Sequence, residues 1–151
     1  MSLIGDIKLH TTNALKSGDS QKANTLRSLI ASVHNEEIAN RSKGGSGELS
    51  HEEVVGVLQK EAKKRKEAAE IYGKAGRGDL ENNEKYELSV IESYLPPALT
   101  DADVEKIVAR VASDGGGNFG NVMGAVMKEI AGRADAKVVT EIVKKSLGGA
   151  E

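Results

Sequence analysis

The chain has 151 residues, a formal net charge of -2 and no cysteine. This length suits one or two small domains, and the lack of cysteine excludes disulfides, thiolate nucleophiles and cysteine-ligated metal sites. No stretch approaches the roughly 18 apolar residues of a membrane span, and the first residues show no charged leader before an apolar run. We therefore expect a soluble, cytoplasmic protein without a membrane partner.

Helical periodicity runs through almost the whole sequence, and no alternation of apolar and polar residues is long enough for a strand. The first apolar stripe predicts a helix over about residues 3–15, and Gly18 follows its end. Asp19 or Ser20 is expected to cap a second helix, which the glycine- and serine-rich stretch at residues 42–47 ends. The pattern predicts an all-α fold.

Two more helices are predicted before a pair of prolines. Ser50 and Glu53 have the spacing of a capping box at the start of the third helix. Asp79 is expected to cap the fourth, and Pro96-Pro97 ends it because residues before a proline avoid the α region. Arg65, near the apolar edge of the third helix, is expected to pair with a carboxylate from another helix.

The proline pair marks the predicted domain boundary. Residues 1–96 are expected to form a four-helix domain of helical hairpins, and residues 97–151 a small bundle of three helices. Within this tail, Thr100 and Asp135 are expected to cap the first and the last helix.

A glycine in the middle of a helix is the most informative feature of the tail. Gly124 interrupts an apolar helical segment, where glycine costs about 1 kcal/mol relative to alanine. Gly120 lies one turn earlier on the same face. The pair leaves a strip without side chains, which either another tail helix or a nucleic-acid backbone could approach. Gly132 is expected to stop this helix.

Basic residues suggest two phosphate-accepting surfaces. Lys128, Arg133 and Lys137 follow the glycines and, together with Gly120 and Gly124, form the first candidate.

The second candidate surface is a ridge on the third helix, where Lys60, Lys63 and Lys64 lie on neighbouring positions of one face. The alternative for this ridge is a solvated helix with pairs such as Lys63–Glu67.

The charge distribution limits what these surfaces can do. Residues 1–99 carry 14 Lys and Arg against 15 Asp and Glu, and residues 100–151 carry 7 against 8. A nucleic-acid partner would therefore have to meet a local basic face. With three tyrosines and one phenylalanine, base-stacking platforms are not expected.

Catalytic and metal motifs are incomplete. Gly115, Gly117 and Gly120 match the spacing G-x-G-x-x-G, but a charged amphipathic helix precedes them where a dinucleotide site needs a buried strand. Three scattered histidines make no zinc or di-iron set, and no serine lies in a G-x-S-x-G elbow. We predict no catalytic residue, no cofactor and no metal.

Three segments resemble one protein family. They are Leu26-Arg27 through Asn35-Glu36-Glu37-Ile38, Gly76-Arg77-Gly78-Asp79-Leu80 through Glu92-Ser93-Tyr94-Leu95-Pro96, and Gly120-Asn121-Val122-Met123-Gly124 through Gly132-Arg133-Ala134-Asp135. On these, the chain is identified as a member of the YqeY-like family over nearly its full length. Its tail is similar to the tail domain of the glutamine-dependent aspartyl/glutamyl-tRNA amidotransferase. Pro97-Ala98 and Ala136 depart from the family pattern of a polar residue with glutamine and of a glycine.

The resemblance implies a tail that contacts tRNA and a family label of carbon-nitrogen ligase with glutamine as amido-N-donor. The candidate tRNA-binding residues are then Gly120, Gly124, Lys128, Arg133 and Lys137, with Lys60, Lys63 and Lys64 as the second surface. We expect a tRNA-binding protein, or an accessory of a tRNA-charging or amidating enzyme, that is not catalytic alone. A component of a glutamine-dependent tRNA amidotransferase and a helical protein-interaction scaffold remain alternatives. The oligomeric state stays open.

Overall fold

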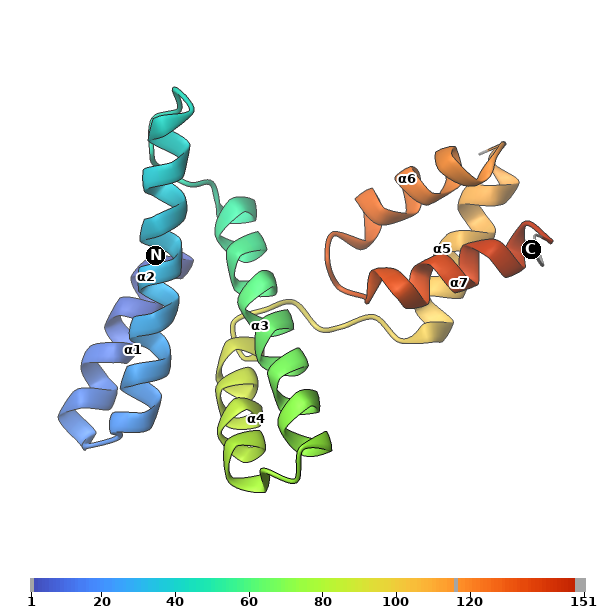
Figure 1. Ribbon diagram of the computed structural model, residues 1–151. Coiled ribbons are helices and arrows are strands. Elements are labelled where there is room, and N and C mark those ends of the chain that lie inside the picture. The colour runs from blue at the N-terminus through green and yellow to red at the C-terminus, as the bar shows by residue number, and fades with distance from the viewer. Residues whose placement is uncertain (1, 116, 149–151) are drawn as a thin grey trace. The chain divides into compact units, whose positions relative to one another are not determined.

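The computed structural model describes residues 2–115 and 117–148, and these residues form helices and no strand (Figure 1). The predicted all-α fold is confirmed. Four helices come first: α1 (Leu3–Ser17), α2 (Ser20–Ser42), α3 (His51–Lys74) and α4 (Gly78–Glu92). Three shorter helices follow: α5 (Asp101–Ser113), α6 (Phe119–Ile130) and α7 (Ala136–Ser146).

The chain divides into two compact units, Met1–Leu95 and Pro96–Glu151. Unit 1 holds α1 to α4, and unit 2 holds α5 to α7. The predicted domains, residues 1–96 and 97–151, place the boundary one residue later and stay a prediction. Residues 1, 116 and 149–151 of these ranges lie outside the described part of the chain.

Side chains predicted as caps begin four of the helices. In the capping box of α3, the Ser50 amide donates to Glu53 Oε2 at 2.7 Å and the Glu53 amide donates to Ser50 Oγ at 3.1 Å. Asp19, Thr100 and Asp135 each accept a hydrogen bond from a first-turn amide of α2, α5 and α7. These bonds satisfy amides that have no partner within the helix.

Two predicted helix ends are wrong. The N-cap of α4 is Arg77, and Asp79 lies inside the first turn, where it pairs with Arg77 at 3.3 Å. α6 ends before Gly132, because Ala131 adopts a left-handed conformation with φ of 50° and donates its amide to the Met127 carbonyl. The left-handed residue that closes this helix is therefore an alanine, although glycine adopts that conformation at lower cost.

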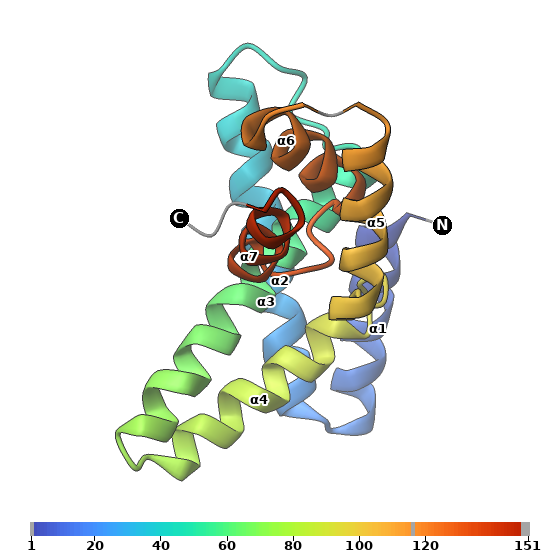
Figure 2. The same cartoon turned by 90° about the vertical axis from the view of Figure 1, so that its right-hand side faces the viewer.

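Unit 1 consists of two helical hairpins, α1–α2 and α3–α4, whose arrangement can be followed in two views (Figures 1 and 2). A shared apolar core holds the hairpins together. Its buried members are Ile7, Leu26, Leu29, Leu58, Val90 and Ile91. Burying each aliphatic side chain of this size contributes about 1.5–3 kcal/mol, so the core is the main source of stability in unit 1.

A charged cluster is also buried in unit 1. Glu61 of α3 is only 7% exposed, and its Oε1 accepts a hydrogen bond from Arg65 Nη1 at 2.6 Å. Lys64 Nζ donates to the other carboxylate oxygen at 3.0 Å, and Arg65 Nη2 donates to Ser28 Oγ of α2 at 3.1 Å. The predicted carboxylate from another helix is therefore wrong for Arg65, since the i, i+4 spacing brings Glu61 of the same helix to it.

Replacing Glu61 with glutamine tests this cluster. Burial opposes ionisation of Glu61, but the hydrogen bonds from Lys64 and Arg65 outweigh it and hold the pKa of this carboxyl below its ordinary value. We expect Glu61→Gln to lower the free energy of unfolding by about 1–3 kcal/mol near neutral pH, because Arg65 loses a charged partner in a buried site. Urea unfolding followed by circular dichroism measures the change.

The pH dependence is the second part of this test. A carboxyl whose pKa is lowered in the fold stabilises it above its unfolded pKa, near pH 4.3, and the effect disappears as the pH falls through the folded pKa. The difference between the wild type and Glu61→Gln should therefore shrink below about pH 4. A difference that stays constant from pH 7 down to pH 3 would contradict the ion-pair account.

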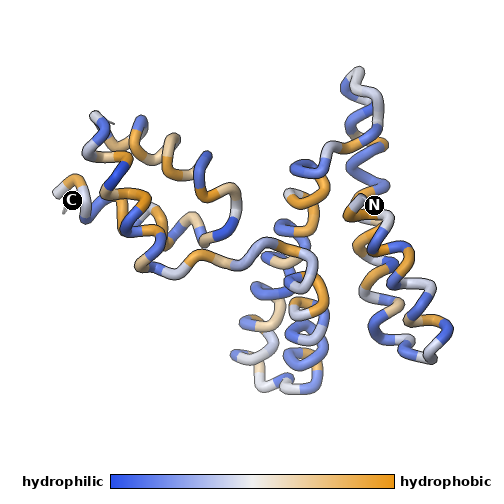
Figure 3. Tube along the Cα trace, turned by 180° about the vertical axis from the view of Figure 1, so that it is seen from behind, coloured by the Kyte–Doolittle hydropathy of each residue, from blue (hydrophilic) through white to orange (hydrophobic). Residues whose placement is uncertain are grey.

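Unit 2 is a three-helix bundle with its own core. The buried side chains are Val104, Val108, Val122, Val126, Ile130, Val139 and Val143. They recur at helical spacing, and apolar residues alternate with polar ones along the helices in Figure 3. The Leu99 amide donates to the Arg133 carbonyl at 2.8 Å, which fastens the segment before α5 to the turn after α6.

Gly124 is not used for packing within unit 2. It is exposed, and a Cβ atom built on it would meet no atom within 4 Å outside its own helix backbone and chain neighbours. A Cβ on Gly120 would meet only the side chain of its own N-cap, Asn118, at 3.5 Å. The expected close approach of another tail helix to these glycines is therefore not found.

Gly124→Ala should stabilise the protein. Since space is available and the backbone is helical, alanine should raise the free energy of unfolding by about 0.5–1 kcal/mol. Gly18→Ala is the matched control, because Gly18 has φ of 79° and alanine there should destabilise by a similar amount. Thermal unfolding of the three proteins measures both effects, and a lower melting temperature for Gly124→Ala would refute this account of the site.

Candidate functional site

One side of α6 presents an uncharged surface. The first nine residues of this helix, 119–127, include no charged side chain. Gly120 and Gly124 are exposed one turn apart, and Met123 and Met127 lie half-buried beside them. We call this surface, with Lys128 at its end, the α6 face. It combines accessible backbone with two flexible apolar side chains, which adapt readily to different binding partners.

The far end of the α6 face is positively charged. Lys128 is exposed in the last turn of α6, and Lys137 is exposed in the first turn of α7, after a short connecting turn. Neither ammonium group forms an ion pair with another described residue. The neighbouring carboxylate of Glu129 is bound to Arg110 of α5. Two exposed lysines therefore remain available to an acidic partner.

Arg133 has a structural role in the same region. Its Nε donates to the Ile130 carbonyl at 3.1 Å and its Nη2 donates to the Glu129 carbonyl at 3.3 Å, so the guanidinium caps the end of α6. Of the residues predicted for the tail surface, the structure thus places Gly120, Gly124 and Lys128 together on one face. Lys137 lies on the next helix, and Arg133 is engaged with backbone.

Different consequences are expected when the two basic residues of the turn are removed. Arg133→Ala should lower the free energy of unfolding by about 1 kcal/mol, because charged hydrogen bonds to two helix-end carbonyls are lost. Lys137→Ala should change it by less than about 0.5 kcal/mol, as expected for an exposed surface residue. Chemical unfolding compares them, and equal stabilities would show that the Arg133 cap contributes nothing.

The ridge predicted on α3 is partly neutralised. Lys64 pairs with Glu61 at 3.0 Å, while Lys63 is exposed and Lys60 borders a cleft between α2 and α3. The alternative pair Lys63–Glu67 does not form among the described residues. The ridge is therefore a weaker basic surface than its sequence indicates.

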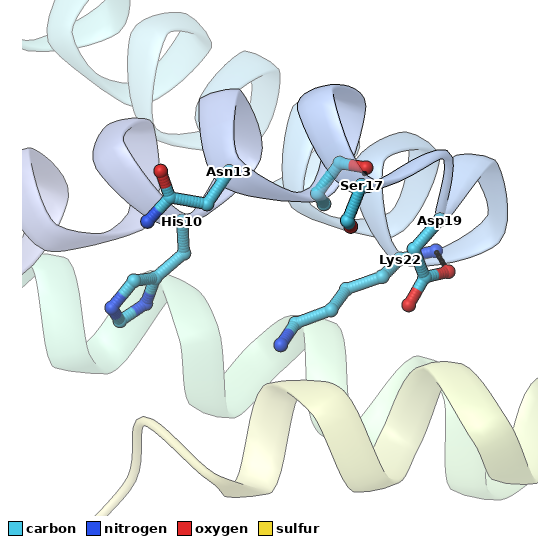
Figure 4. Close-up of a pocket in the computed structure, with 6 residues that line it drawn as sticks. His10, Asn13, Ser17, Asp19 and Lys22 are labelled. Carbon is cyan, nitrogen blue, oxygen red and sulfur yellow. Dashed lines mark hydrogen bonds between the residues drawn. The ribbon is translucent and has the colours of Figure 1, made fainter.

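Two clefts of about 350 Å³ each lie in unit 1. The first follows α1 and the start of α2 and is lined by His10, Asn13, Ala14, Ser17, Asp19 and Lys22 (Figure 4). The second is lined by Glu36, Asn40, Lys43, Leu49, Glu53, Gly56, Val57 and Lys60. In the first cleft Asp19 accepts the Lys22 amide at 3.1 Å, so its carboxylate already caps α2.

His10 links this cleft to the end of unit 1. Its Nδ1 lies 2.6 Å from the Tyr94 hydroxyl, and the two rings are 5.7 Å apart. Burial and, to a smaller extent, the charge of Asp6 raise the pKa of Tyr94. Sequence reasoning missed this contact because the two residues are 84 positions apart and no periodic pattern connects them.

The other sequence signals concern isolated groups. Across residues 2–115 and 117–148, no group of three or more His, Cys, Asp and Glu side chains could hold a metal ion. His34 lies 3.6 Å from Glu37 in a surface pair. None of the described helices has the length and apolar composition needed to cross a membrane.

Fold and surface define the class: an all-helical protein whose tail bundle carries an exposed, uncharged helix face. A comparison with protein families matches residues 5–147 to the family described as Yqey-like protein, and the chain belongs to this family. The family expected from the three sequence segments is therefore confirmed.

Two fungal relatives share the name "Altered inheritance of mitochondria protein 41, mitochondrial". The protein from Pyrenophora tritici-repentis is 28% identical over 142 residues, which cover 90% of this chain and 76% of that relative. The protein from Eremothecium gossypii is 32% identical over 107 residues, which cover 71% of this chain and 56% of that relative. The similarity thus spans about half of the second relative and three quarters of the first.

These names contradict the predicted function. A tRNA-binding or tRNA-enzyme accessory protein was expected, with a ligase component or a scaffold as alternatives, whereas both relatives are named for the inheritance of mitochondria. The expectation depended on basic residues as phosphate ligands. Of these, Arg133 caps α6 and Lys64 is neutralised by Glu61, so neither is a free cation.

The predicted cytoplasmic location is contradicted as well, because both relatives are described as mitochondrial. That expectation came from the absence of an obvious leader. Such a signal reports on targeting, and it carries no physical information about where the folded helices act.

Proposed function

We propose that this chain acts in mitochondria, in the process for which its relatives are named, as a protein that binds a partner through the α6 face. The observation that carries this proposal is the exposed, uncharged surface of α6, with Gly120 and Gly124 open and two methionines beside them. Exposed apolar surface on a stable bundle is a common sign of an interaction site.

The energetics of the helix support the proposal. Gly124 costs about 1 kcal/mol in helix stability relative to alanine, and no contact inside unit 2 makes use of the space it leaves. A local choice that opposes the fold without a return inside it is expected at a functional site. Close approach of a partner backbone would use that space.

We also propose that unit 2 has the same structural type as the amidotransferase tail domain. Three short helices, with the glycine-containing helix second, support this likeness. It concerns the fold alone and assigns no reaction and no RNA to the chain.

Complementation in a fungus tests the function. The chain, fused to a mitochondrial leader, is expressed in Eremothecium gossypii cells that lack the relative, and the transmission of mitochondria is scored by microscopy. We expect the wild type to restore normal inheritance. Gly124→Leu should fail, because its side chain fills the open strip of the α6 face.

Gly56→Leu is the matched control for this experiment. Gly56 also lies inside a helix, and a Cβ built on it meets no atom within 4 Å, but it belongs to α3 in unit 1. This variant should restore inheritance as well as the wild type does, at equal protein level on immunoblots. If the wild type fails at that level, the proposed function is wrong.

A further inference from the structure

We infer that the partner of the α6 face is an amphipathic helix of another protein, with an apolar stripe and with acidic residues at one end. This inference rests on the proposed function, since it specifies the chemistry of the partner that the same face would bind. Three properties of the described residues lead to it.

The first property is the shape of the face. A helix that crosses α6 above Gly120 and Gly124 meets no side chain there, so the two backbones can approach closely. Met123 and Met127 border that strip and are half-buried, which leaves part of each thioether for an apolar partner. Flexible methionines beside a groove are suited to the apolar stripe of a helix.

The second property is the uneven distribution of charge. The residues from 119 to 127 offer no ion, so a charged side chain placed above them would lose water without gaining a partner. Lys128 and Lys137 at the far end lack carboxylate partners among the described side chains. A complementary helix is therefore apolar along most of its contact and acidic beside Lys128.

The third property is the direction of α6. Lys128 lies in its C-terminal turn, so the acidic end of the partner lies there too. Acidic residues are most stable in the first turn of a helix, where they complement its dipole. The partner helix therefore runs antiparallel to α6, with its acidic first turn beside Lys128 and its apolar turns above Gly124 and Gly120.

Synthetic peptides test the partner chemistry directly. The probe is a fluorescein-labelled amphipathic helix of about 18 residues with leucines at helical spacing and glutamates in its first turn. One control peptide carries lysines in place of these glutamates, and another has the same composition in scrambled order. Fluorescence anisotropy measures their binding to the full chain, to Gly124→Leu, to Gly56→Leu and to Lys128→Glu.

We expect the acidic peptide to bind the wild type and Gly56→Leu equally, and Gly124→Leu at least about tenfold more weakly. Lys128→Glu should weaken the acidic peptide by about tenfold and reverse the preference toward the lysine peptide. Circular dichroism confirms that each variant is folded. Because Lys128 is exposed, its replacement keeps the test decisive even if Gly124→Leu unfolds.

Several results would overturn the inference. These are equal binding of the acidic and scrambled peptides, unchanged binding to both variants of the α6 face, and occupation of the face by a second copy of the chain. Sedimentation of the wild type and Gly124→Leu detects the last case as a dimer that the substitution dissociates. If complementation depends on Gly124 but no acidic helix binds, the proposed function stands and the partner chemistry is wrong.

Discussion

The burial of Val122, Val126 and Ile130 fixes how α6 is turned in its bundle, and the outer surface of unit 2 depends on it. These side chains follow each other at intervals of four residues and are completely excluded from solvent. Once they point into the core, the 3.6-residue period places Gly120 and Gly124 toward solvent and the two methionines at the margin. One core stripe thus determines both the packing of the tail and the surface it presents.

Unit 1 depends on a comparable core, but it also buries an ion pair. Glu61 and Arg65 lie on one helix, and their link to Ser28 joins α3 to α2 beside Leu26, Leu29 and Leu58. Apolar contacts give this unit most of its stability, while the directional bonds of Arg65 favour one pairing of the two hairpins. The strongest cation of the chain is thereby used inside the fold.

The sequence predicted what depends on local rules. Apolar periodicity predicted the helices, and Ser50, Asp19, Thr100 and Asp135 were recognised as caps because their side chains act within one turn. It could not predict which basic residues are free. Arg133 is engaged with carbonyls at the end of its own helix, and His10 meets Tyr94 through tertiary packing. Such pairings follow from the three-dimensional arrangement, which periodicity does not specify.

The central claim is that the α6 face is a binding surface, and nuclear magnetic resonance tests it most directly. The acidic helical peptide is titrated into the 15N-labelled full chain, and the amide shifts are followed residue by residue. The account predicts that the largest changes lie at Gly120, Gly124 and Lys128, with small changes along α3. Changes centred on Lys60 and Lys63, or none at saturating peptide, would contradict it.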